Sequence, residues 1–428
     1  MFRIARTSRR HAARVLALSL SAAFVGCGGS ADDATTNAVV YEGATLVTGD
    51  GSAPIENAVF VVENGRFTSV GPAGSVDVPN GASRVDLSGK TVMPTFVNAH
   101  IHLSLDRAER EEQLRHMAYY GAGTVVSMGL DEGAAAFEVR ESPVADGART
   151  LIAGRGVTSP EPGRSEIPHW VTTEDEARAA VAEEAEQGVD LVKIWVDDRN
   201  GQYERLSSPL YSAVIDEAHQ RGLKVAAHIF RLEDAKGLLR SGIDMFAHGI
   251  RDQDVDDELM SLWAERPNVV LIPNLPGPGV AADLSWISTV PPAELQEMQA
   301  RETDRPAAQA SFGIQARNLD RLNDAGMRIA FGTDGSSPWA VHLELEDMVR
   351  AGMSPAEVIV AATRNSAELF GLTDIGVVAA GNIADFVVLD ANPLQDITNT
   401  RRISDVYLSG AAIDRPAMAL RFRGEAMQ

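Results

Sequence analysis

The chain has 428 residues, of which 45% are hydrophobic and 23% are charged, as in ordinary globular proteins. This length suits one large domain with a smaller appendage, or two domains. The formal net charge is −22, and it becomes −27 without residues 1–27, which contain five arginines and no acid. A surface this acidic repels phosphate backbones, so we expect no nucleic-acid partner.

The N-terminus reads as an export signal. An Arg-rich segment precedes the apolar stretch Val15 to Val25 and then Cys27. The order valine, glycine, cysteine is similar to a bacterial lipobox, in which the cysteine becomes the lipidated first residue; cleavage near Ala23 is the alternative. We expect residues 1–27 to be a lipoprotein-type signal peptide and residues 28–36 a tether. The protein would then be a periplasmic or outer-membrane lipoprotein of a Gram-negative bacterium, with membrane contact only through its lipid.

Cys27 is also the only cysteine of the chain. Disulfides, zinc–thiolate sites and cysteine nucleophiles are therefore excluded from the mature protein. Any metal ion must be held by His, Asp, Glu or a less usual ligand.

The first part of the mature chain, up to Lys90, shows short strand-like pieces separated by turn signals. Asn64-Gly65 between two apolar-rich runs is a strong hairpin signal, because both residues accept positive φ. Strand character returns from Gly376 to Ile403. We predict a discontinuous β-sandwich domain made of residues 37–91 and 373–428.

Between these parts, strand-like and helix-like segments alternate. The helices expected over 172–188 and 207–222 have N-cap residues at Thr172 or Thr173 and at Ser208, and each ends at a glycine. The pattern indicates a TIM-like (β/α)8 barrel over residues 92–372, with a doubly wound sheet as the alternative. The eight expected strands are Val92–His100, Thr124–Gly129, Thr150–Val157, Leu191–Val196, Lys224–Phe230, Met245–Ile250, Val269–Leu275 and Arg328–Asp334. Residues 276–310 interrupt the pattern, as a lid or as a plain connection.

His100 and His102 end the first expected strand. In an extended strand the side-chain period is two, so both imidazoles lie on one face and can chelate one metal ion. Such a pair is a weak signal alone. However, later apolar runs also have a potential ligand near their carboxyl ends, namely Lys193, His228, His248 and Asp334.

Lys193 is an unexpected residue at its position, because it lies in a continuous apolar run, LVKIWV. A buried ammonium costs several kcal/mol unless it is paired or neutralised. The lysine could pair with an acid or extend to the barrel mouth. As a neutral amine it could instead capture carbon dioxide and become an anionic carbamate.

The chain resembles the amidohydrolase superfamily at this point, specifically its imidazolonepropionase-like and prolidase-like members. The resemblance runs from about Val39 to about Ile403. Its matching stretches are PTFVNAHIH, GVDLVKIWVDD, AHQRGLKVAAH, GIDMFAHG, MRIAFGTDG, ATRNSAELFGL and GNIADFVVLDANPL.

The resemblance implies two divalent metal ions, expected to be zinc; a single ion with Lys193 uncarboxylated is the alternative. His100, His102 and Asp334 would hold one ion, and His228 and His248 the other. Lys193, carboxylated on its amine, would bridge both. A hydroxide shared by the two ions would attack the substrate, and Asp334 would act as the catalytic general base and then acid.

The loops after the third and fourth expected strands contain candidate substrate contacts. Arg164, His169 and Tyr203 are the residues that we single out, because an Arg or Tyr at the mouth can bind a peptide carboxylate. Arg199 and Arg205 lie in the same loops. Phe230 stands where some relatives have a polar residue.

We expect a metal-dependent hydrolase that cleaves a carbon–nitrogen bond of an amide, dipeptide or cyclic amide. A lactone, carbamate or phosphoester hydrolase with the same centre is one alternative. A non-catalytic metal- or substrate-binding lipoprotein is another. The oligomeric state is not indicated by the sequence.

Overall fold

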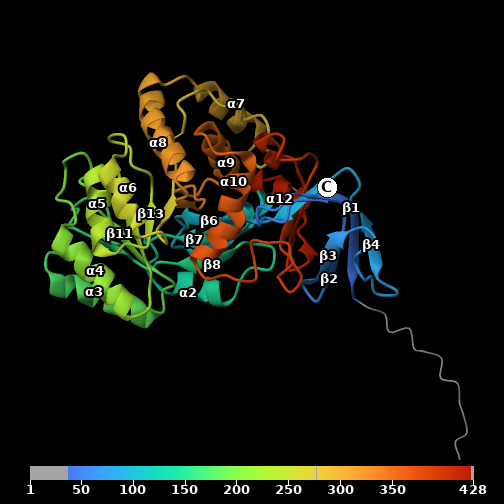
Figure 1. The fold of residues 1–428 in the computed structure, drawn as a ribbon, viewed down its shortest axis with the longest axis horizontal. Helices are drawn as coiled ribbons and strands as arrows, with labels where there is room; N and C mark the ends of the chain where they lie inside the picture. Colours follow the sequence, from blue (N-terminus) through green and yellow to red (C-terminus); the bar gives the residue numbers. More distant parts are fainter. Residues whose placement is uncertain (1–36, 276, 426–428) are drawn as a thin grey trace, which may run out of the picture.

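The computed structural model describes residues 37–275 and 277–425. The expected signal peptide, its Cys27 and the tether lie outside the described residues. Within them the protein is an α/β structure in which both ends of the chain meet in one sheet, beside two parallel sheets covered by helices (Figure 1).

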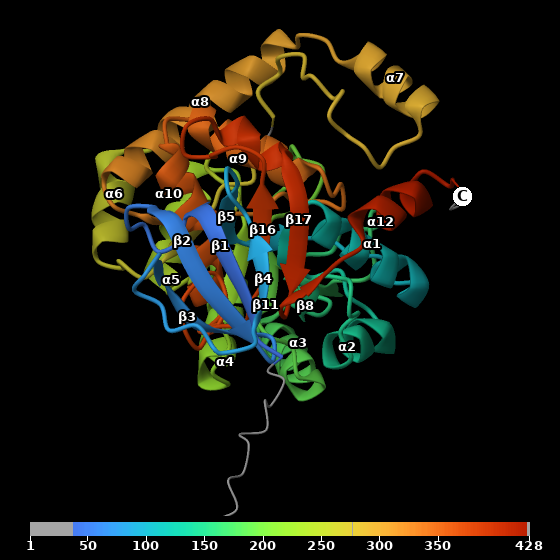
Figure 2. The same cartoon turned by 90° about the vertical axis from the view of Figure 1, so that its right-hand side faces the viewer.

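Eight strands from the two ends of the chain form one sheet, which we call the composite sheet. Its order is β18-β17-β16-β5-β1-β2-β3, and β4 pairs with β1. Figure 2 shows the blue N-terminal strands beside the red C-terminal ones. The strands are Val39–Leu46 (β1), Ile55–Glu63 (β2), Arg66–Pro72 (β3), Ser83–Asp86 (β4), Thr91–Pro94 (β5), Phe386–Leu389 (β16), Ile403–Leu408 (β17) and Ala411–Ala412 (β18).

The expected hairpin joins β2 to β3, with φ of 51° at Asn64 and 76° at Gly65. An aromatic cluster packs across the sheet from both ends of the chain. Tyr41 stacks on Phe60 at 4.9 Å, and Phe386 meets Tyr41 edge-on at 5.3 Å. These contacts explain why residues more than 300 positions apart share one core.

The remaining strands form two parallel sheets. The first has the order β6-β7-β8 and the second β10-β9-β11-β12-β13-β14-β15. The strands are Phe96–Ile101 (β6), Ala122–Ser127 (β7), Arg149–Ile152 (β8), Val157–Thr158 (β9), His169–Trp170 (β10), Val192–Trp195 (β11), Val225–His228 (β12), Met245–Ala247 (β13), Val270–Ile272 (β14) and Arg328–Ile329 (β15).

Backbone hydrogen bonds connect the two parallel sheets at both seams. Ala99 N donates to Phe331 O at 2.8 Å on one side, and Asp190 N donates to Ile152 O at 2.9 Å on the other. Ala99 and Val126 of the first sheet also share a buried cluster with Ala226 of the second. Both sheets therefore enclose one interior of mostly small side chains.

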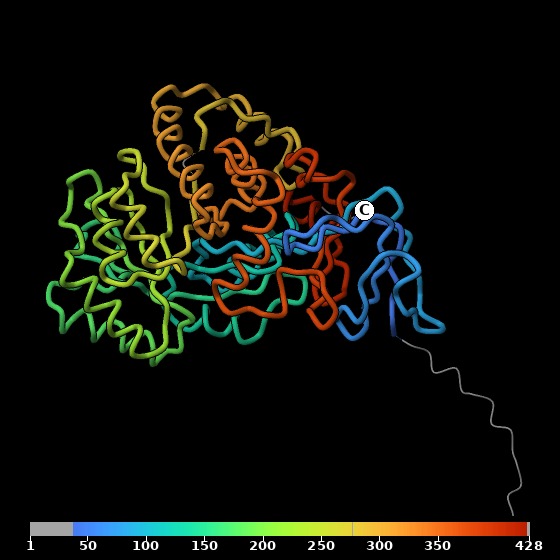
Figure 3. Tube along the Cα trace, in the orientation of Figure 1, coloured from blue at the N-terminus to red at the C-terminus, as the bar shows by residue number. Residues whose placement is uncertain are grey.

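Helices cover the outer faces of these sheets (Figure 3). Thr173 caps α3 in a reciprocal capping box with Glu176, and Gly188 ends the helix in the left-handed conformation, as predicted. The helices are Arg107–Tyr119 (α1), Ala134–Glu141 (α2), Glu174–Gln187 (α3), Ser208–Gln220 (α4), Leu232–Ser241 (α5), Asp257–Ala264 (α6), Pro292–Arg301 (α7), Pro306–Asp324 (α8), Ala340–Arg350 (α9), Pro355–Val360 (α10), Ser366–Leu369 (α11) and Arg415–Phe422 (α12).

Some expected strands are divided differently in the structure. The apolar run that begins at Val92 splits, so that β5 joins the composite sheet and only β6 joins a parallel sheet. The boundary predicted between residues 91 and 92 thus falls inside β5. Likewise, the strand expected over 150–157 splits into β8 and β9. Within the described ranges, no helix combines the length and apolarity that crossing a bilayer requires.

Candidate metal centre

The predicted ligands gather at one edge of the parallel sheets. His100 lies in β6, Lys193 in β11, and His228 ends β12. His248 follows β13, and Asp334 lies five residues after β15. Because the carboxyl ends of parallel strands meet at the same edge, side chains from distant parts of the sequence converge there.

His100, His248 and Asp334 form the tightest group, since one ligand atom of each lies within 4.8 Å of the others. Asp334 Oδ1 is 3.5 Å from His100 Nε2 and 3.2 Å from His102 Nε2. Asp334 Oδ2 is 3.5 Å from His248 Nε2. Three imidazoles thus surround one carboxylate, as in a site for a divalent cation.

The protonation states suit a metal site. Burial lowers the pKa of His100 and of His248 well below the usual value, so both rings are neutral at neutral pH. Burial alone would raise the pKa of Asp334, but its hydrogen bond to His102 and the nearby positive groups lower it below its usual range. Neutral imidazoles and an ionised carboxylate are the ligand forms that metal ions bind.

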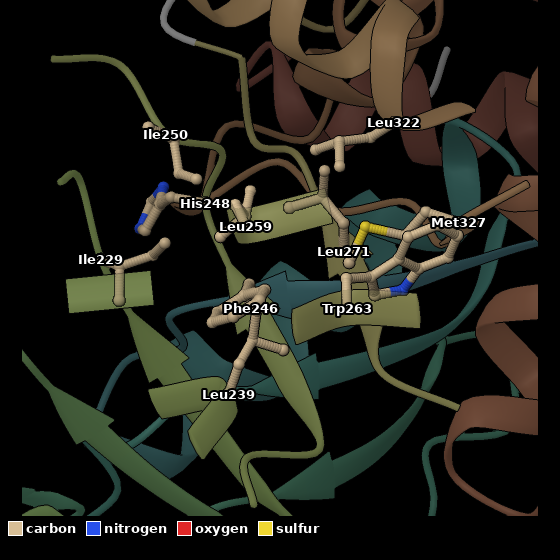
Figure 4. Close-up of a pocket in the computed structure, with 10 residues that line it drawn as sticks. All are labelled: Ile229, Leu239, Phe246, His248, Ile250, Leu259, Trp263, Leu271, Leu322 and Met327. Carbon is tan, nitrogen blue, oxygen red and sulfur yellow. The ribbon is translucent and has the colours of Figure 1, made fainter. Parts of the chain in front are cut away.

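His248 shows most directly that the centre fits a metal ion. Both of its ring nitrogens are buried and have no hydrogen-bond partner among the described residues. Behind the ring lies an apolar wall that includes Ile229, Phe246 and Ile250 (Figure 4). Unpaired buried nitrogens are costly, so an electron-pair acceptor such as a metal ion is the partner that this position fits.

Asn274, which sequence reasoning missed, lies beside His100. Its Nδ2 is 2.6 Å from His100 Nδ1, while its Oδ1 is buried without a partner. A half-turn of the amide would let Oδ1 accept the Nδ1 proton, and His100 Nε2 would then offer its lone pair to a metal ion. The only sequence signal was its place just after β14.

Glycine at position 332 permits this close packing. A Cβ there would lie 2.9 Å from the Cβ of His100 and 2.6 Å from Cγ2 of Ile272. No other residue fits without moving the strand that holds His100.

Lys193 is fully buried, and its Nζ lies 3.3 Å from His100 Nε2. Burial lowers its pKa to about 7, with Arg199 adding to the effect and Asp334 opposing it. No carboxylate pairs with the amine among the described residues, so the ion-pair alternative for Lys193 receives no support. At neutral pH, Lys193 is therefore a neutral amine in a substantial fraction of the molecules.

His228 stands slightly apart from the other ligands. Its ring centroid is 4.5 Å from that of His248, but its Nε2 lies 3.2 Å from Asp197 Oδ2 and 3.3 Å from Arg199 Nη1. Burial lowers the pKa of His228 to about 4. Sequence reasoning did not single out Asp197, although its spacing of four from Lys193 on an extended segment places both on one face.

A cavity of about 320 Å³ opens beside the centre. Its lining includes His102, Leu130, Thr158, Glu161, Arg164, Ser165, Pro168, Trp195, Arg199, His228 and Asp334. It therefore joins the metal-binding side chains to the loops after β9 and β11, where a substrate has room to bind.

Only one of the three predicted substrate-binding residues lines the cavity. Arg164 lines the cavity and pairs with Glu161. His169 Nε2 instead lies 2.7 Å from Glu184 Oε1 of α3, and Tyr203 donates its hydroxyl proton to Pro162 O at 3.1 Å. The structure does not bring these two side chains into the cavity lining.

Parallel sheets with candidate metal ligands at the carboxyl ends of their strands are typical of enzymes with an active site at that edge. Comparison with known proteins supports an enzyme of this kind. Residues 91–413 match the model of the amidohydrolase family. The chain therefore belongs to the amidohydrolase family and is a hydrolase that acts on carbon–nitrogen bonds.

Individual relatives span most of the chain. An imidazolonepropionase of Salinispora tropica is 27% identical over 80% of this chain and 89% of its own length. A solved structure of a proposed prolidase from Bifidobacterium longum is 28% identical, covers 91% of this chain and 99% of that one, and has a TM-score of 0.74. Phenylurea hydrolase B is 25% identical over 89% and 97%, with a TM-score of 0.73. These neighbours imply that the two parallel sheets form a TIM-like barrel.

Proposed function

We propose that this protein is an exported two-metal amidohydrolase that cleaves the C–N bond of an amide, dipeptide or cyclic amide. The observation that carries the proposal is the convergence of His100, His248 and Asp334, with Lys193 in contact with His100. The imidazolonepropionase, prolidase and phenylurea hydrolase relatives support the type of bond.

His100, His102 and Asp334 would hold one ion, and His228 and His248 the second, with zinc as the metal that this nitrogen- and oxygen-rich set suits. When bound, the ions supply an activated water and polarise the substrate carbonyl. A neutral Lys193 amine could bind carbon dioxide and, as a carbamate, reach both positions.

Asp334 is the residue that would move the proton. Its carboxylate is ionised and contacts three imidazoles, and its side chain is 38% exposed, so it also faces the cavity. It would accept the proton of the attacking water and pass it to the leaving nitrogen. The hydrogen bond to His102 would orient the carboxylate during both steps.

Export rests on the N-terminal sequence alone. The Arg-rich segment and the apolar stretch before Cys27 support a lipid-anchored protein outside the cytoplasm. Radiolabelled palmitate incorporation that Cys27→Ser abolishes would support the anchor.

The test of the function is turnover by the metal-loaded protein on a panel of dipeptides and hydantoins. We expect Asp334→Asn to lower kcat by about 10²- to 10⁴-fold, with metal content measured on the same samples. Asp254→Asn, at an exposed ion pair with Arg317, is the matched control and should keep full activity. Full activity of Asp334→Asn would refute the proton role, and metal binding without any turnover would favour the binding lipoprotein.

A further inference from the structure

One arginine near the metal centre has no anionic partner among the described residues. The loops that follow β9, β11, β12 and β13 contain five arginines, namely Arg164, Arg199, Arg205, Arg231 and Arg251. The first four each pair with at least one carboxylate within 4 Å, on Glu161, Asp197, Asp198 or Asp234. Arg251 makes no ion pair or side-chain hydrogen bond with any described residue.

The contact that Arg251 does make leaves its donors free. Its Cζ lies 3.5 Å from the ring centroid of Phe230, so the face of the guanidinium is stacked on the aromatic ring. Stacking occupies one face of the guanidinium group, whereas its N–H donors point outward in the plane of that group. Nε is buried without an acceptor, and neither terminal amino group has one among the described residues. Buried donors normally have partners, so the donors of Arg251 are available to an acceptor on a bound molecule.

The position of Arg251 is held by neighbours of the metal centre. Its backbone N–H donates to Phe230 O at 3.0 Å. The Phe230 ring lies 4.4 Å from that of His228 and 5.3 Å from that of His248. Guanidinium, phenyl ring and two candidate ligands therefore form one contiguous group at the barrel mouth.

The side chain remains a cation there. Burial lowers the pKa of Arg251 to about 10, opposed by the charges of Asp334 and Asp197. At neutral pH a guanidinium cation with coplanar donors thus lies close enough to the candidate centre to interact with Asp334 and Asp197, although Arg251 is not among the residues that line the 320 Å³ cavity. This arrangement matches a carboxylate, which accepts two parallel hydrogen bonds from one guanidinium.

We propose that Arg251 binds a carboxylate group of the substrate and so selects amides that have an acid near the scissile bond. The proposal deepens the function proposed above and rests on it. Phe230, which sequence analysis noted as a departure from relatives, is then the platform that orients the guanidinium.

Binding of inert acids tests this without turnover. Leucine, proline and phenylacetate are titrated calorimetrically into the zinc-loaded protein, each against its alcohol (leucinol, prolinol and 2-phenylethanol). We expect at least one acid to bind about 10- to 100-fold more tightly than its alcohol. Arg251→Met should remove this preference and leave alcohol binding within about twofold, and Arg251→Lys should keep part of it.

Arg231→Met is the matched control, because Arg231 lies in a neighbouring loop but pairs with Asp198. It should keep the full preference for acids. Metal content and melting temperature of each variant show that the centre is intact, and Arg251→Lys serves as the probe if the Met variant does not fold. The inference is overturned if the wild type shows no preference for any acid, if the preference survives in Arg251→Met, or if it is undiminished in Arg251→Lys. Neither result depends on turnover, which separately tests the hydrolase.

Discussion

At the scale of single residues, the six candidate ligands do not form one uniform cluster. Five of them contact one another around Asp334 and His100, whereas His228 Nε2 is directed to Asp197 and Arg199. The structure thus sets His228 apart, but it groups His248, which the proposal assigns to the second ion with His228, with His100 and Asp334. Substitution of His228 therefore tests whether a second metal position exists.

We predict that His228→Asn lowers the metal content from two ions per chain to one, because the group around Asp334 stays complete. Plasma mass spectrometry after zinc loading and gel filtration measures this content. His219→Asn, on α4 where His219 pairs with Asp244 at 2.9 Å, should retain both ions. Loss of both ions, or of neither, from the His228 variant would contradict the assignment.

At the scale of secondary-structure elements, the end of β7 is shaped by the lysine of β11. Gly129 has φ of 85°, and a Cβ there would lie 2.8 Å from Lys193 Cβ and 2.6 Å from the Trp195 ring. Both the backbone conformation and the space therefore require glycine. Gly133 has nearly the same φ, 84°, but open space around it.

This pair of glycines separates backbone strain from steric overlap. We predict that Gly133→Ala lowers the free energy of unfolding by about 1–3 kcal/mol through strain alone, because its φ of 84° and ψ of 179° lie in a region essentially restricted to glycine. Gly129→Ala should lower it by about 2–4 kcal/mol, because the clash adds to the strain. Urea unfolding measures both values, and equal losses would show that the packing against Lys193 does not matter.

Helix α9 contributes an acid with an unusual pKa. Asp347 is 6% exposed, and burial raises its pKa to about 7, with Glu346 adding to the effect and the ion pair with Arg350 opposing it. In the unfolded chain its pKa is about 4. The folded state therefore binds an extra proton between these two values, and stability falls as pH rises through that window.

We predict that Asp347→Asn removes this pH dependence. The free energy of unfolding of the variant minus that of the wild type should rise by about 1–3 kcal/mol from pH 5 to pH 8.5. Urea titrations at both pH values give this difference, and Asp254→Asn at an exposed pair should show no such change. A constant difference between Asp347→Asn and wild type would mean that Asp347 is already ionised at pH 5.

At the scale of the whole molecule, the composite sheet ties the two ends of the chain to the barrel. β5 pairs with β1 on one side and β16 on the other, and it leads directly into β6 with its ligand His100. Asp385, just before β16, pairs with Arg149 of β8. The composite sheet is thus connected directly to the strand that contains the candidate ligand His100.

Removal of the metal ions should therefore lower the stability of the entire fold. We predict that dialysis against a chelator lowers the melting temperature by about 5–10 °C, because ions that bind only the native state stabilise it. Differential scanning calorimetry before and after dialysis measures the shift, and added zinc should reverse it. An unchanged melting temperature would argue against a metal site held by residues from five strands.

The order of ligands was visible in the sequence because each one lies in or near the end of an apolar run, and strand ends meet in a parallel sheet. The hairpin at Asn64 and the caps of α3 were visible for local reasons of φ and hydrogen bonding. The division of the run after Val92 into two strands in different sheets was not, since continuous hydrophobicity does not show where a chain changes sheets. The β-sandwich remains a prediction, as the eight strands pair in one sheet.

The amino-acid sequence by itself indicated the candidate metal ligands through residue type and spacing, and its resemblance to the amidohydrolase superfamily predicted the family and the type of bond cleaved. Only the tertiary structure decided which side chains face one another. It placed His169 beside Glu184, His228 beside Asp197, and Arg251 on Phe230 with no acid partner among the described residues. Such pairings depend on loop paths and on burial between distant segments, and neither periodicity nor composition encodes them locally.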